Sequence, residues 1–290
     1  MELRHLRYFL AVATERNFTR AAEQLGIGQP PLSQQIKSLE GELGVDLFRR
    51  KPHGAELTPA GAAFLVEAKR VLDLAQRATL AAQRAGRGQV GHMRLGFTGS
   101  AAFNPIVSTL IRRFSHKYPD VELALEEANT PTLLQGILGD RLDAAFLRPG
   151  SKGLDGVVLH RFPDEAMKIV LPSAHPLASR RRLPLSALTN DSFVLVPGAA
   201  GFTLRDEIIR ACERAGFTPK LAQPAPQVSS VVNLVAAGLG VSVVPTSMTQ
   251  VRVRGVRYLG IEAPKMHARL ALAWRPSGES VVLDNFIAML

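Results

Sequence analysis

Residues 26–40 read GIGQPPLSQQIKSLE, in which two glycines and two adjacent prolines stand directly before an amphipathic stretch. Proline costs little in the first turn of a helix, because the amide that it lacks would have no intrahelical partner there. Gly26 and Gly28 permit a tight reversal of the chain before that point. We therefore predict that a helix begins at Pro30 and Pro31, directly after a tight turn.

Two further helices are predicted upstream of this turn. Apolar residues recur at helical spacing from Leu3 to Ala13. Asn17 is a suitable cap for a second, short helix, FTRAAEQL at 18–25. The apolar positions of the third helix are Leu32, Ile36, Leu39 and Leu43. They are four, three and four residues apart, and this spacing predicts one apolar stripe that faces a core.

The opposite face of the third helix is polar. At about 100° per residue, Ser33, Gln34 and Lys37 project away from the apolar stripe, and Pro30 lies beside them. Such side chains can reach base edges and phosphates in a major groove, which admits one helix. A solvated face is the usual interpretation of an arbitrary amphipathic helix. Here the tight turn, the helix start and the basic segment that follows favour DNA recognition.

That basic segment is DLFRRKPHGAELTPAG, residues 46–61. Leu47 and Phe48 are expected to anchor it to the core, and Leu57 to return the chain. Between them lie four basic residues in a loop with proline and glycine, namely Arg49, Arg50, Lys51 and His53. This pattern is typical of a basic wing that tracks phosphates and touches the minor groove.

A long helix is predicted next. Thr58 caps it, Pro59 occupies its first turn, and it runs to Gly86 with a length of about 42 Å. Leucines and alanines recur along it at intervals of seven residues, at Leu65 and Leu72 and at Ala68, Ala75 and Ala82. A stripe that extends beyond a small domain needs a partner helix.

Residues 86–91, GRGQVG, match the glycine spacing of dinucleotide-binding loops. That motif requires a strand before it and a helix after it. Here a helix precedes and a predicted strand follows, so we interpret the segment as a hinge.

From residue 92 onwards strands and helices alternate in two similar modules. The first contains MRLGFT, NPIVSTLIRRFSHKYP, VELALEE, PTLLQGILGDR and LDAAFLR, and the second contains SFVLVPG, TLRDEIIRACERAG, KLAQPA, SSVVNLVAAGLG and VSVVP. This alternation predicts parallel sheets covered by helices, arranged as two α/β lobes.

Ligands of open α/β sheets bind beyond the carboxyl ends of the strands, where helix N-termini supply free amides. The positions selected in this way are Thr98, Ser100, Asn129, Thr130, Arg148, Phe202, Thr203 and Val228. Hydroxyls, amides and one arginine suit a carboxylate ligand. Two alternatives stay open: the hydroxyls can be ordinary helix caps, and Arg148 can pair with a surface carboxylate.

Residues 1 to about 65 resemble the winged helix-turn-helix of LysR-type transcriptional regulators, carried by LRYFLAVATERNFTRAAEQLGIGQPPLSQQIKSLEGELGVDLFRR and LTPAG. The resemblance implies an α + α/β fold with a winged helix-turn-helix, a long linker helix and a two-lobed periplasmic-binding-protein-like (Rossmann-like) effector domain. The implied parts are a DNA-binding domain at 1–58, a linker and dimerisation helix at 59–87, a hinge at 88–91, lobe I at 92–161 plus 269–290, and lobe II at 162–268.

By position, the resemblance implies groove contacts on the third helix and backbone contacts on the wing, from Gln29, Pro30, Ser33, Gln34, Lys37, Arg50 and His53. Many relatives carry arginine where this chain has Gln34. Arginine favours guanine and glutamine favours adenine, so the base preference at that contact stays open.

The segments GFTGS, NTPT, GFT and VNLVAAGLGVSVVP most resemble regulators of aromatic-compound catabolism that sense muconate- or benzoate-like acids. The effector contacts implied are Ser100, Thr130, Phe202, Thr203 and Val228. The expected partners are double-stranded DNA, an organic-acid co-inducer without other cofactors, and further copies of the chain in dimers or tetramers. RNA polymerase is a further expected contact, and no membrane is.

Composition sets limits on other functions. A net charge of +10 and a pI near 10.3 favour polyanionic partners. The single cysteine, Cys212, excludes an intramolecular disulfide and a four-cysteine zinc site. The opening MELRHLRYFL lacks the features of a secretory signal, and no apolar run has the roughly 20 residues of a membrane span. We therefore expect a cytoplasmic protein.

The main rival functions are an enzyme, a solute-binding protein and a DNA-binding repressor without an effector. The seven histidines show no H-x-x-x-H spacing, and there is no G-x-S-x-G motif. A solute-binding protein should be exported and lack the first ninety residues. The effector-free repressor is the alternative that stays open.

Overall fold

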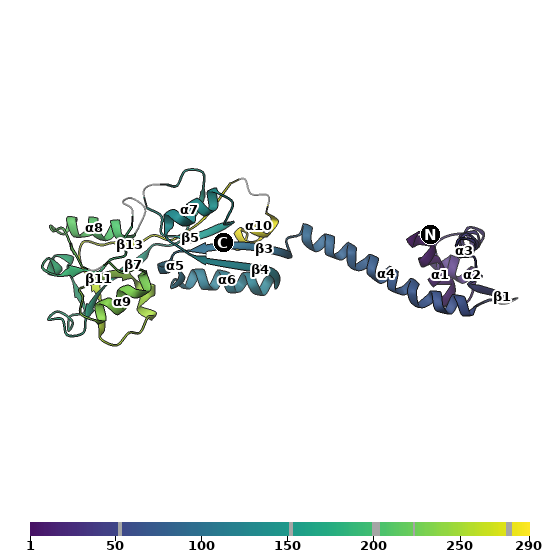
Figure 1. Ribbon diagram of the computed structural model, residues 1–290, viewed down its shortest axis with the longest axis horizontal. Coiled ribbons are helices and arrows are strands. Elements are labelled where there is room, and N and C mark those ends of the chain that lie inside the picture. The colour runs from purple at the N-terminus through teal and green to yellow at the C-terminus, as the bar shows by residue number, and fades with distance from the viewer. Residues whose placement is uncertain (52–53, 151–152, 199–203, 223, 277–279) are drawn as a thin grey trace. The chain divides into compact units, whose positions relative to one another are not determined.

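The computed structural model describes residues 1–51, 54–150, 153–198, 204–222, 224–276 and 280–290. The chain divides into two compact units, Met1–Ala85 and Gly86–Leu290 (Figure 1).

The first unit is a winged helix-turn-helix, as the sequence predicts. Its helices and strands are α1 (Leu3–Glu15), α2 (Phe18–Leu25), α3 (Gln29–Leu43), β1 (Phe48–Lys51), β2 (Gly54–Leu57) and α4 (Pro59–Gly86). Strands β1 and β2 pair antiparallel and form the wing.

Local signals account for the turn between α2 and α3. Asn17 caps α2, because its Oδ1 accepts hydrogen bonds from the amides of Thr19 (2.9 Å) and Arg20 (3.1 Å). Gly26 ends α2 with a φ of 66°, a left-handed conformation that favours glycine. Helix α3 begins at Gln29, one residue before the predicted start, with its prolines in the first turn.

The core of this unit lies under α3, where Leu32, Ile36 and Leu39 are fully buried. The expectation that Leu43 extends the buried stripe was wrong, since its side chain is 38 % exposed. Residues 41–46 are all exposed, so the last turn of α3 lies outside the core.

Two polar side chains fix the wing and α4 to this core. The Oε1 atom of Glu40 accepts hydrogen bonds from the amides of Leu47 (2.8 Å) and Phe48 (3.1 Å), which joins α3 to β1. Thr58 accepts from the amide of Gly61 at 2.9 Å and donates to the Asp46 carbonyl at 2.7 Å. The direction of α4 is therefore set at its first turn.

Helix α4 is amphipathic over only part of its 28 residues. Leu65, Ala68 and Leu72 pack against the core of the first unit. Beyond them Leu74 is 66 % exposed and Leu80 is 49 % exposed. The second half of α4 thus carries apolar side chains that the described part of the chain leaves uncovered.

The first sheet of the second unit has the strand order β4-β3-β5-β14-β6. Its strands are β3 (Val90–Phe97), β4 (Asp120–Glu127), β5 (Ala144–Leu147), β6 (Val158–Arg161) and β14 (Ala271–Trp274). Strand β3 runs parallel to β4 and β5, and β14 runs antiparallel to β5 and β6. Because β3 begins at Val90, the last two residues of the expected hinge, 88–91, are paired with β4.

Helices cover both faces of the first sheet (Figure 1). They are α5 (Gly99–Ala102), α6 (Pro105–Lys117), α7 (Thr130–Leu138) and α10 (Val281–Ile287). Phe146 packs with α6 and α10, whereas its neighbours Ala145 and Leu147 pack with α7. Successive side chains of β5 therefore point to opposite faces of the sheet, one covered by α6 and α10 and the other by α7.

The second sheet is built around β7, with the order β11-β7-β12-β8 and β13 also paired to β7. The strands are β7 (Glu165–Pro172), β8 (Arg182–Leu183), β11 (Ser242–Pro245), β12 (Val256–Ile261) and β13 (His267–Ala268). Helix α8 (Leu204–Arg214) packs on one face and α9 (Val228–Ala236) on the other. The short elements η1 (Leu185–Leu188), η2 (Thr246–Gln250), β9 (Ser192–Phe193) and β10 (Lys220–Leu221) complete this part.

The expectation of parallel sheets was only partly correct, because both sheets are mixed and the second, apart from the parallel pair β12–β8, is antiparallel in its described pairs. Strand β7 pairs antiparallel with β11, β12 and β13. The predicted strand SFVLVPG contributes only the two-residue strand β9, which pairs parallel with β10 outside the main sheet. Strand β7 lies in the stretch that the repeat pattern left between the modules. Strand direction depends on long-range pairing, and the local pattern does not encode it.

Within the described residues, no helix is long and apolar enough to cross a membrane.

Candidate functional site

The polar face of α3 carries five of the expected DNA-contacting residues. Pro30, Gln34 and Lys37 are exposed, and Gln29 and Ser33 are half-buried. Gln29 Nε2 donates a hydrogen bond to Ser33 Oγ at 3.0 Å, so these two side chains fix each other. Neither Gln34 nor Lys37 has a hydrogen bond or ion pair within the described residues. They are therefore open to an external partner.

The wing lies beside this face. Lys37 on α3 and Arg50 on β1 line the same open hollow of about 630 Å³. The guanidinium of Arg50 lies 4.8 Å from the ring centroid of Phe18, a cation–π contact that orients the side chain. His53 lies outside the described residues. Basic side chains from α3 and the wing thus border one hollow, which Glu40 and Asp46 also line.

The second unit contains a cavity of about 320 Å³ at the ends of strands β3, β4 and β5. Six of the eight expected ligand-binding residues line it: Thr98, Ser100, Asn129, Thr130, Arg148 and Val228. The other two, Phe202 and Thr203, lie outside the described residues. The volume is at the lower end of the range for small-molecule sites.

The hydroxyl and amide groups that line this cavity differ in whether the protein itself supplies their hydrogen-bond partners. Asn129 caps α7, since its Oδ1 accepts from the amide of Thr132 at 2.9 Å. Thr130 Oγ1 donates to the carbonyl of Arg148 at 3.5 Å. Thr98 is 8 % exposed, and its Oγ1 is buried without a hydrogen-bond partner in the described part of the chain. Of these three residues, Thr98 is the one whose polar side-chain atom is buried without a partner in the described residues.

Two of the helices that begin at the cavity have no side-chain cap. Thr98 precedes α5 and Gln227 precedes α9, and neither side chain accepts a hydrogen bond from the first turn. The first amides of a helix have no intrahelical partner, and a ligand anion can satisfy them.

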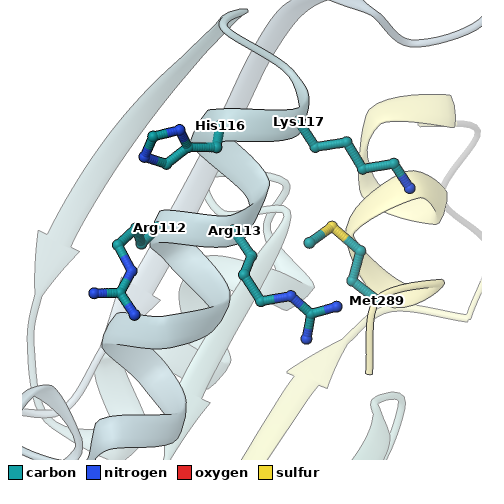
Figure 2. A pocket seen from close by; sticks show the side chains of 5 residues that line it. All are labelled: Arg112, Arg113, His116, Lys117 and Met289. Atoms are coloured by element: carbon teal, nitrogen blue, oxygen red, sulfur yellow. The ribbon is translucent and has the colours of Figure 1, made fainter.

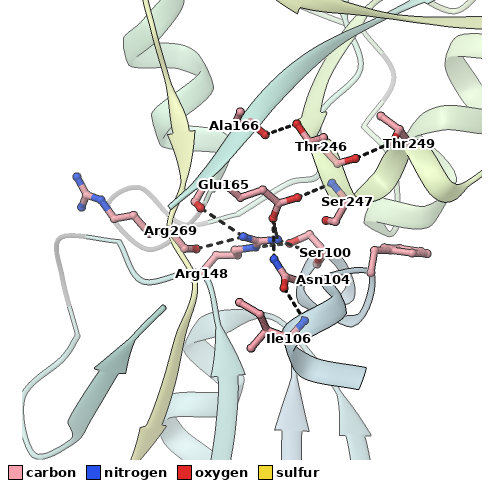
Figure 3. A network of polar contacts seen from close by, with 12 residues as sticks. Ser100, Asn104, Ile106, Arg148, Glu165, Ala166, Thr246, Ser247, Thr249 and Arg269 are labelled. Carbon is pink, nitrogen blue, oxygen red and sulfur yellow. Dashed lines mark hydrogen bonds and ion pairs between the residues drawn. The ribbon is translucent and has the colours of Figure 1, made fainter. Parts of the chain in front are cut away.

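Arg148 forms the centre of a buried polar network (Figure 3). Its Nη2 forms an ion pair with Glu165 Oε2 at 2.9 Å and donates to the Ser100 carbonyl at 3.1 Å. Its Nε donates to Ser100 Oγ at 3.3 Å, and Nη1 donates to the carbonyls of Ala268 and Arg269 at 3.5 and 3.4 Å. A guanidinium has five N–H donors, so every donor of Arg148 has a protein acceptor.

The carboxylate in this network is equally well satisfied. Glu165 Oε2 also accepts from Asn104 Nδ2 at 3.1 Å, and Oε1 accepts from the amide of Ser247. Burial by itself raises the pKa of Glu165, but the hydrogen bond from the Ser247 amide and the charge of Arg148 lower that pKa below its ordinary value. Burial lowers the pKa of Arg148, and the Glu165 carboxylate opposes that effect. Of the two alternatives for Arg148, pairing with a carboxylate is confirmed, but the partner Glu165 is only 11 % exposed and is not a surface residue.

Sequence reasoning missed several lining residues, among them Glu127, Arg205 and Gln227. Glu127 is the last residue of β4, Arg205 lies in the first turn of α8, and Gln227 directly precedes α9. Their positions at strand and helix ends were signals of the same kind as those used for Thr98.

A second cluster of charge lies on α6 (Figure 2). Arg112, Arg113, His116 and Lys117 line an open hollow of about 530 Å³ with Met289. All four basic side chains are exposed, and Lys117 Nζ lies 5.4 Å from the ring centroid of Tyr118. No buried polar group accompanies them in the described residues that line the hollow, so we treat this as a solvated basic surface.

Comparison with known proteins relates both units to one family. Residues 3–62 match the bacterial regulatory helix-turn-helix family of lysR type, and residues 86–290 match the LysR substrate binding domain. The chain is 38 % identical to the regulator BudR of Raoultella terrigena, with all of both chains covered. It is 35 % identical to the regulator AlsR of Bacillus subtilis (strain 168), over 99 % of this chain and 94 % of that one.

Among solved structures, CbnR, described as a LysR family transcriptional regulator, is 28 % identical with a TM-score of 0.88, and 99 % of each chain is covered. A second structure of full-length CbnR contains its target DNA and has a TM-score of 0.84 at 27 % identity, over 99 % of this chain and 98 % of that one.

Proposed function

This chain belongs to the LysR family of DNA-binding transcriptional regulators, and from that premise we propose that a small organic acid in the second unit controls its action on DNA. It is a regulator rather than an enzyme, because the relatives that it matches are named as transcriptional regulators. The observation that carries the proposal is the cavity of about 320 Å³ lined by six of the residues selected from the sequence.

On the DNA side, we propose that α3 enters a major groove with Gln34 and Lys37 as its free contacts. Arg50 on the wing then contacts phosphates, as do the other basic residues expected there. Support comes from the exposure of Gln34 and Lys37 and from the hollow that Lys37 shares with Arg50. A glutamine can pair with adenine through two hydrogen bonds, so the Gln34 contact should favour adenine.

We propose further that the protein binds DNA as a dimer through α4, and as a tetramer when two dimers meet. The exposed leucines in the second half of α4 support a partner helix. Two recognition helices about one helical turn of DNA apart would then read a partly symmetric site. Contact with RNA polymerase stays a prediction.

The ligand side of the proposal is a carboxylic acid of the aromatic or muconate-like kind. Uncapped helix starts, the unpartnered Thr98 hydroxyl and the guanidinium of Arg205 support an anionic ligand. The acid can act as a switch only if it binds one arrangement of the protein more tightly than another.

The DNA side is tested with sites selected from a random-sequence library and binding measured by fluorescence anisotropy at several salt concentrations. Lys37→Gln should weaken binding to all sites and reduce the salt slope by about 1. Gln34→Ala should relax the preference at one base pair. Lys117→Gln removes the same charge from the second unit and is the matched control. Equal behaviour of the two lysine variants would contradict the assignment of α3.

The ligand side is tested by thermal-shift screening of small aromatic and unsaturated carboxylic acids. Thr98→Val removes a hydroxyl that has no partner, so the variant should fold normally and lose part of the ligand-induced rise in Tm. A binding acid that also changes the affinity for the selected DNA supports the proposal. If no acid changes either quantity, the protein is better described as a repressor without an effector.

A further inference from the structure

The charges around the cavity restrict which acid it can hold. Arg148 was the expected anchor for a ligand carboxylate, but its five donors are all occupied and its charge is balanced by Glu165. The Arg148–Glu165 pair therefore adds no net charge to the lining of the cavity. Among the described residues that line it, the other charged ones are Glu127 and Arg205.

Arg205 has the properties of a ligand anchor. It lines the cavity from the first turn of α8, is half-buried, and has no ion pair or hydrogen bond within the described residues. A cation in the first turn of a helix is disfavoured by the helix dipole. The helix itself therefore gives no reason for an arginine at this position. Its planar fork matches a carboxylate in two parallel hydrogen bonds.

Glu127 lines the same cavity from the end of β4. Its Oε1 stands directly over Gly99, because a Cβ added to Gly99 would come within 2.6 Å of that oxygen. Glu127 likewise has no ion pair or hydrogen bond in the described part of the chain. An ionised carboxylate only accepts hydrogen bonds, so it favours a ligand donor and repels a second negative charge.

We infer that the cavity binds a small, singly charged carboxylic acid that also carries a hydroxyl or amino donor, with Arg205 as the carboxylate anchor and Glu127 as the acceptor. This inference rests on the proposed function and narrows its ligand class. A dicarboxylate would place its second carboxylate near Glu127, and the described lining offers no further unpaired cation to balance it. Arg148 acts as a positioning residue that orders Ser100 and does not contact the ligand charge.

The test uses the full-length protein and isothermal titration calorimetry with matched probes. Each set contains a parent acid, its hydroxy and amino derivatives, and its dicarboxylate: for example benzoate, 2-hydroxybenzoate, 2-aminobenzoate and benzene-1,2-dicarboxylate, with a short aliphatic set beside it. Within at least one set we expect the hydroxy or amino acid to bind at least about tenfold more tightly than the dicarboxylate. Tighter binding of the dicarboxylates, or binding of no acid in either set, overturns the inference.

Two variants separate the roles of the charges. Arg205→Gln should weaken binding of the preferred acid at least about tenfold, whereas Arg210→Gln, on the same helix but outside the cavity, should change it less than about twofold. Glu127→Gln keeps an acceptor and removes the charge, so it should improve dicarboxylate binding several-fold and give no such gain for the hydroxy or amino acid, whose donor loses a charged acceptor. Glu122→Gln, on the same strand, is its control. Unchanged selectivity in Glu127→Gln overturns the inference even if Arg205→Gln does not fold.

The outcome is separable from that of the proposed function. A dicarboxylate that binds tightly and alters DNA affinity would sustain the function and overturn the ligand class. A hydroxy or amino acid that binds through Arg205 and leaves DNA affinity unchanged would sustain the ligand class and contradict the proposed function.

Discussion

At the scale of single residues, Arg148 shows how an arginine that the sequence places at a ligand site can serve the protein instead. Its position after β5 was predictable, because it follows an apolar strand. Its partner was not, because Glu165 lies 17 positions later at the start of β7, a strand that the repeat pattern did not identify. Only the folded chain brings the two side chains together, with Arg148 4 % and Glu165 11 % exposed.

This pair leads to a stability prediction. Glu165→Gln leaves the buried guanidinium of Arg148 without a counter-charge, and loss of one partner of a buried pair costs about 3–5 kcal/mol. We expect a loss of that size in the free energy of unfolding, measured by urea titration. Glu122→Gln, an exposed glutamate on β4, should change it by less than about 0.5 kcal/mol. Similar values for the two variants would show that the pair contributes little.

The same carboxylate makes the difference between wild type and Glu165→Gln depend on pH. The pKa of Glu165 is lowered in the folded protein, so the unfolded chain takes up a proton at a higher pH than the folded one. The stabilisation is fully present above the ordinary glutamate pKa of 4.5 and is lost as the pH falls through the lower folded value. Urea titrations at neutral pH and in acid should show the difference shrinking only below about pH 4.5. A constant difference would contradict the assignment.

The pKa of Cys212 is shifted upwards, opposite to that of Glu165, and this leads to a prediction about the reactivity of its thiol. It is fully buried on α8, and burial raises the pKa of its thiol to about 11. Only the thiolate reacts with alkylating reagents. We therefore expect negligible labelling by iodoacetamide at pH 8 in the native protein and rapid labelling in urea, followed by mass spectrometry. Rapid labelling of the native protein would show that α8 opens readily.

At the scale of elements, local chemistry made the helices of the first unit predictable and left much of the second sheet unpredictable. Asn17, Gly26 and the two prolines act within a few residues of where they stand, so their effect can be read directly from the sequence. The direction of β7 is set by pairing with β11 and β12, more than sixty residues away. The same distinction between local and long-range effects holds at the cavity. The strand ends were predicted from local sequence, but the neutralisation of Arg148 depends on Glu165, which only the folded chain brings close.

One element contact invites a direct test, namely that between α4 and the segment before the wing. A Cβ on Gly61 would come within 2.0 Å of the Leu47 carbonyl oxygen, a backbone atom that cannot move aside cheaply. Gly61→Ala should therefore destabilise the first unit by several kcal/mol, within the range of severe single substitutions. The readout is thermal or urea unfolding followed by circular dichroism.

Gly41 on α3 is the matched control for this substitution. A Cβ there meets nothing within 4 Å, and helical alanine is favoured over glycine by about 0.5–1 kcal/mol. Gly41→Ala should be neutral or stabilising. If Gly61→Ala behaves in the same way, α4 does not approach Leu47 as closely as described.

At the scale of the whole molecule, the second half of α4 is the part of the described chain that most requires a partner. Leu74→Glu places a charge on an apolar position that is 66 % exposed in the single chain. If a second copy covers this surface, the substitution should weaken self-association at least about tenfold by sedimentation velocity. Leu221→Glu, at a position 51 % exposed in the second unit, is the control and should leave association unchanged.

The same variant separates dimerisation from DNA contact. Leu74→Glu leaves α3 and the wing intact, so binding to a DNA fragment with one half-site should change little. Binding to a fragment with two half-sites should weaken much more, because linked recognition helices gain affinity from effective concentration that separate ones lack. Fluorescence anisotropy on the two fragments gives both values. Equal losses on both would place the defect in the first unit itself, and no loss on either would mean that dimers form through another surface.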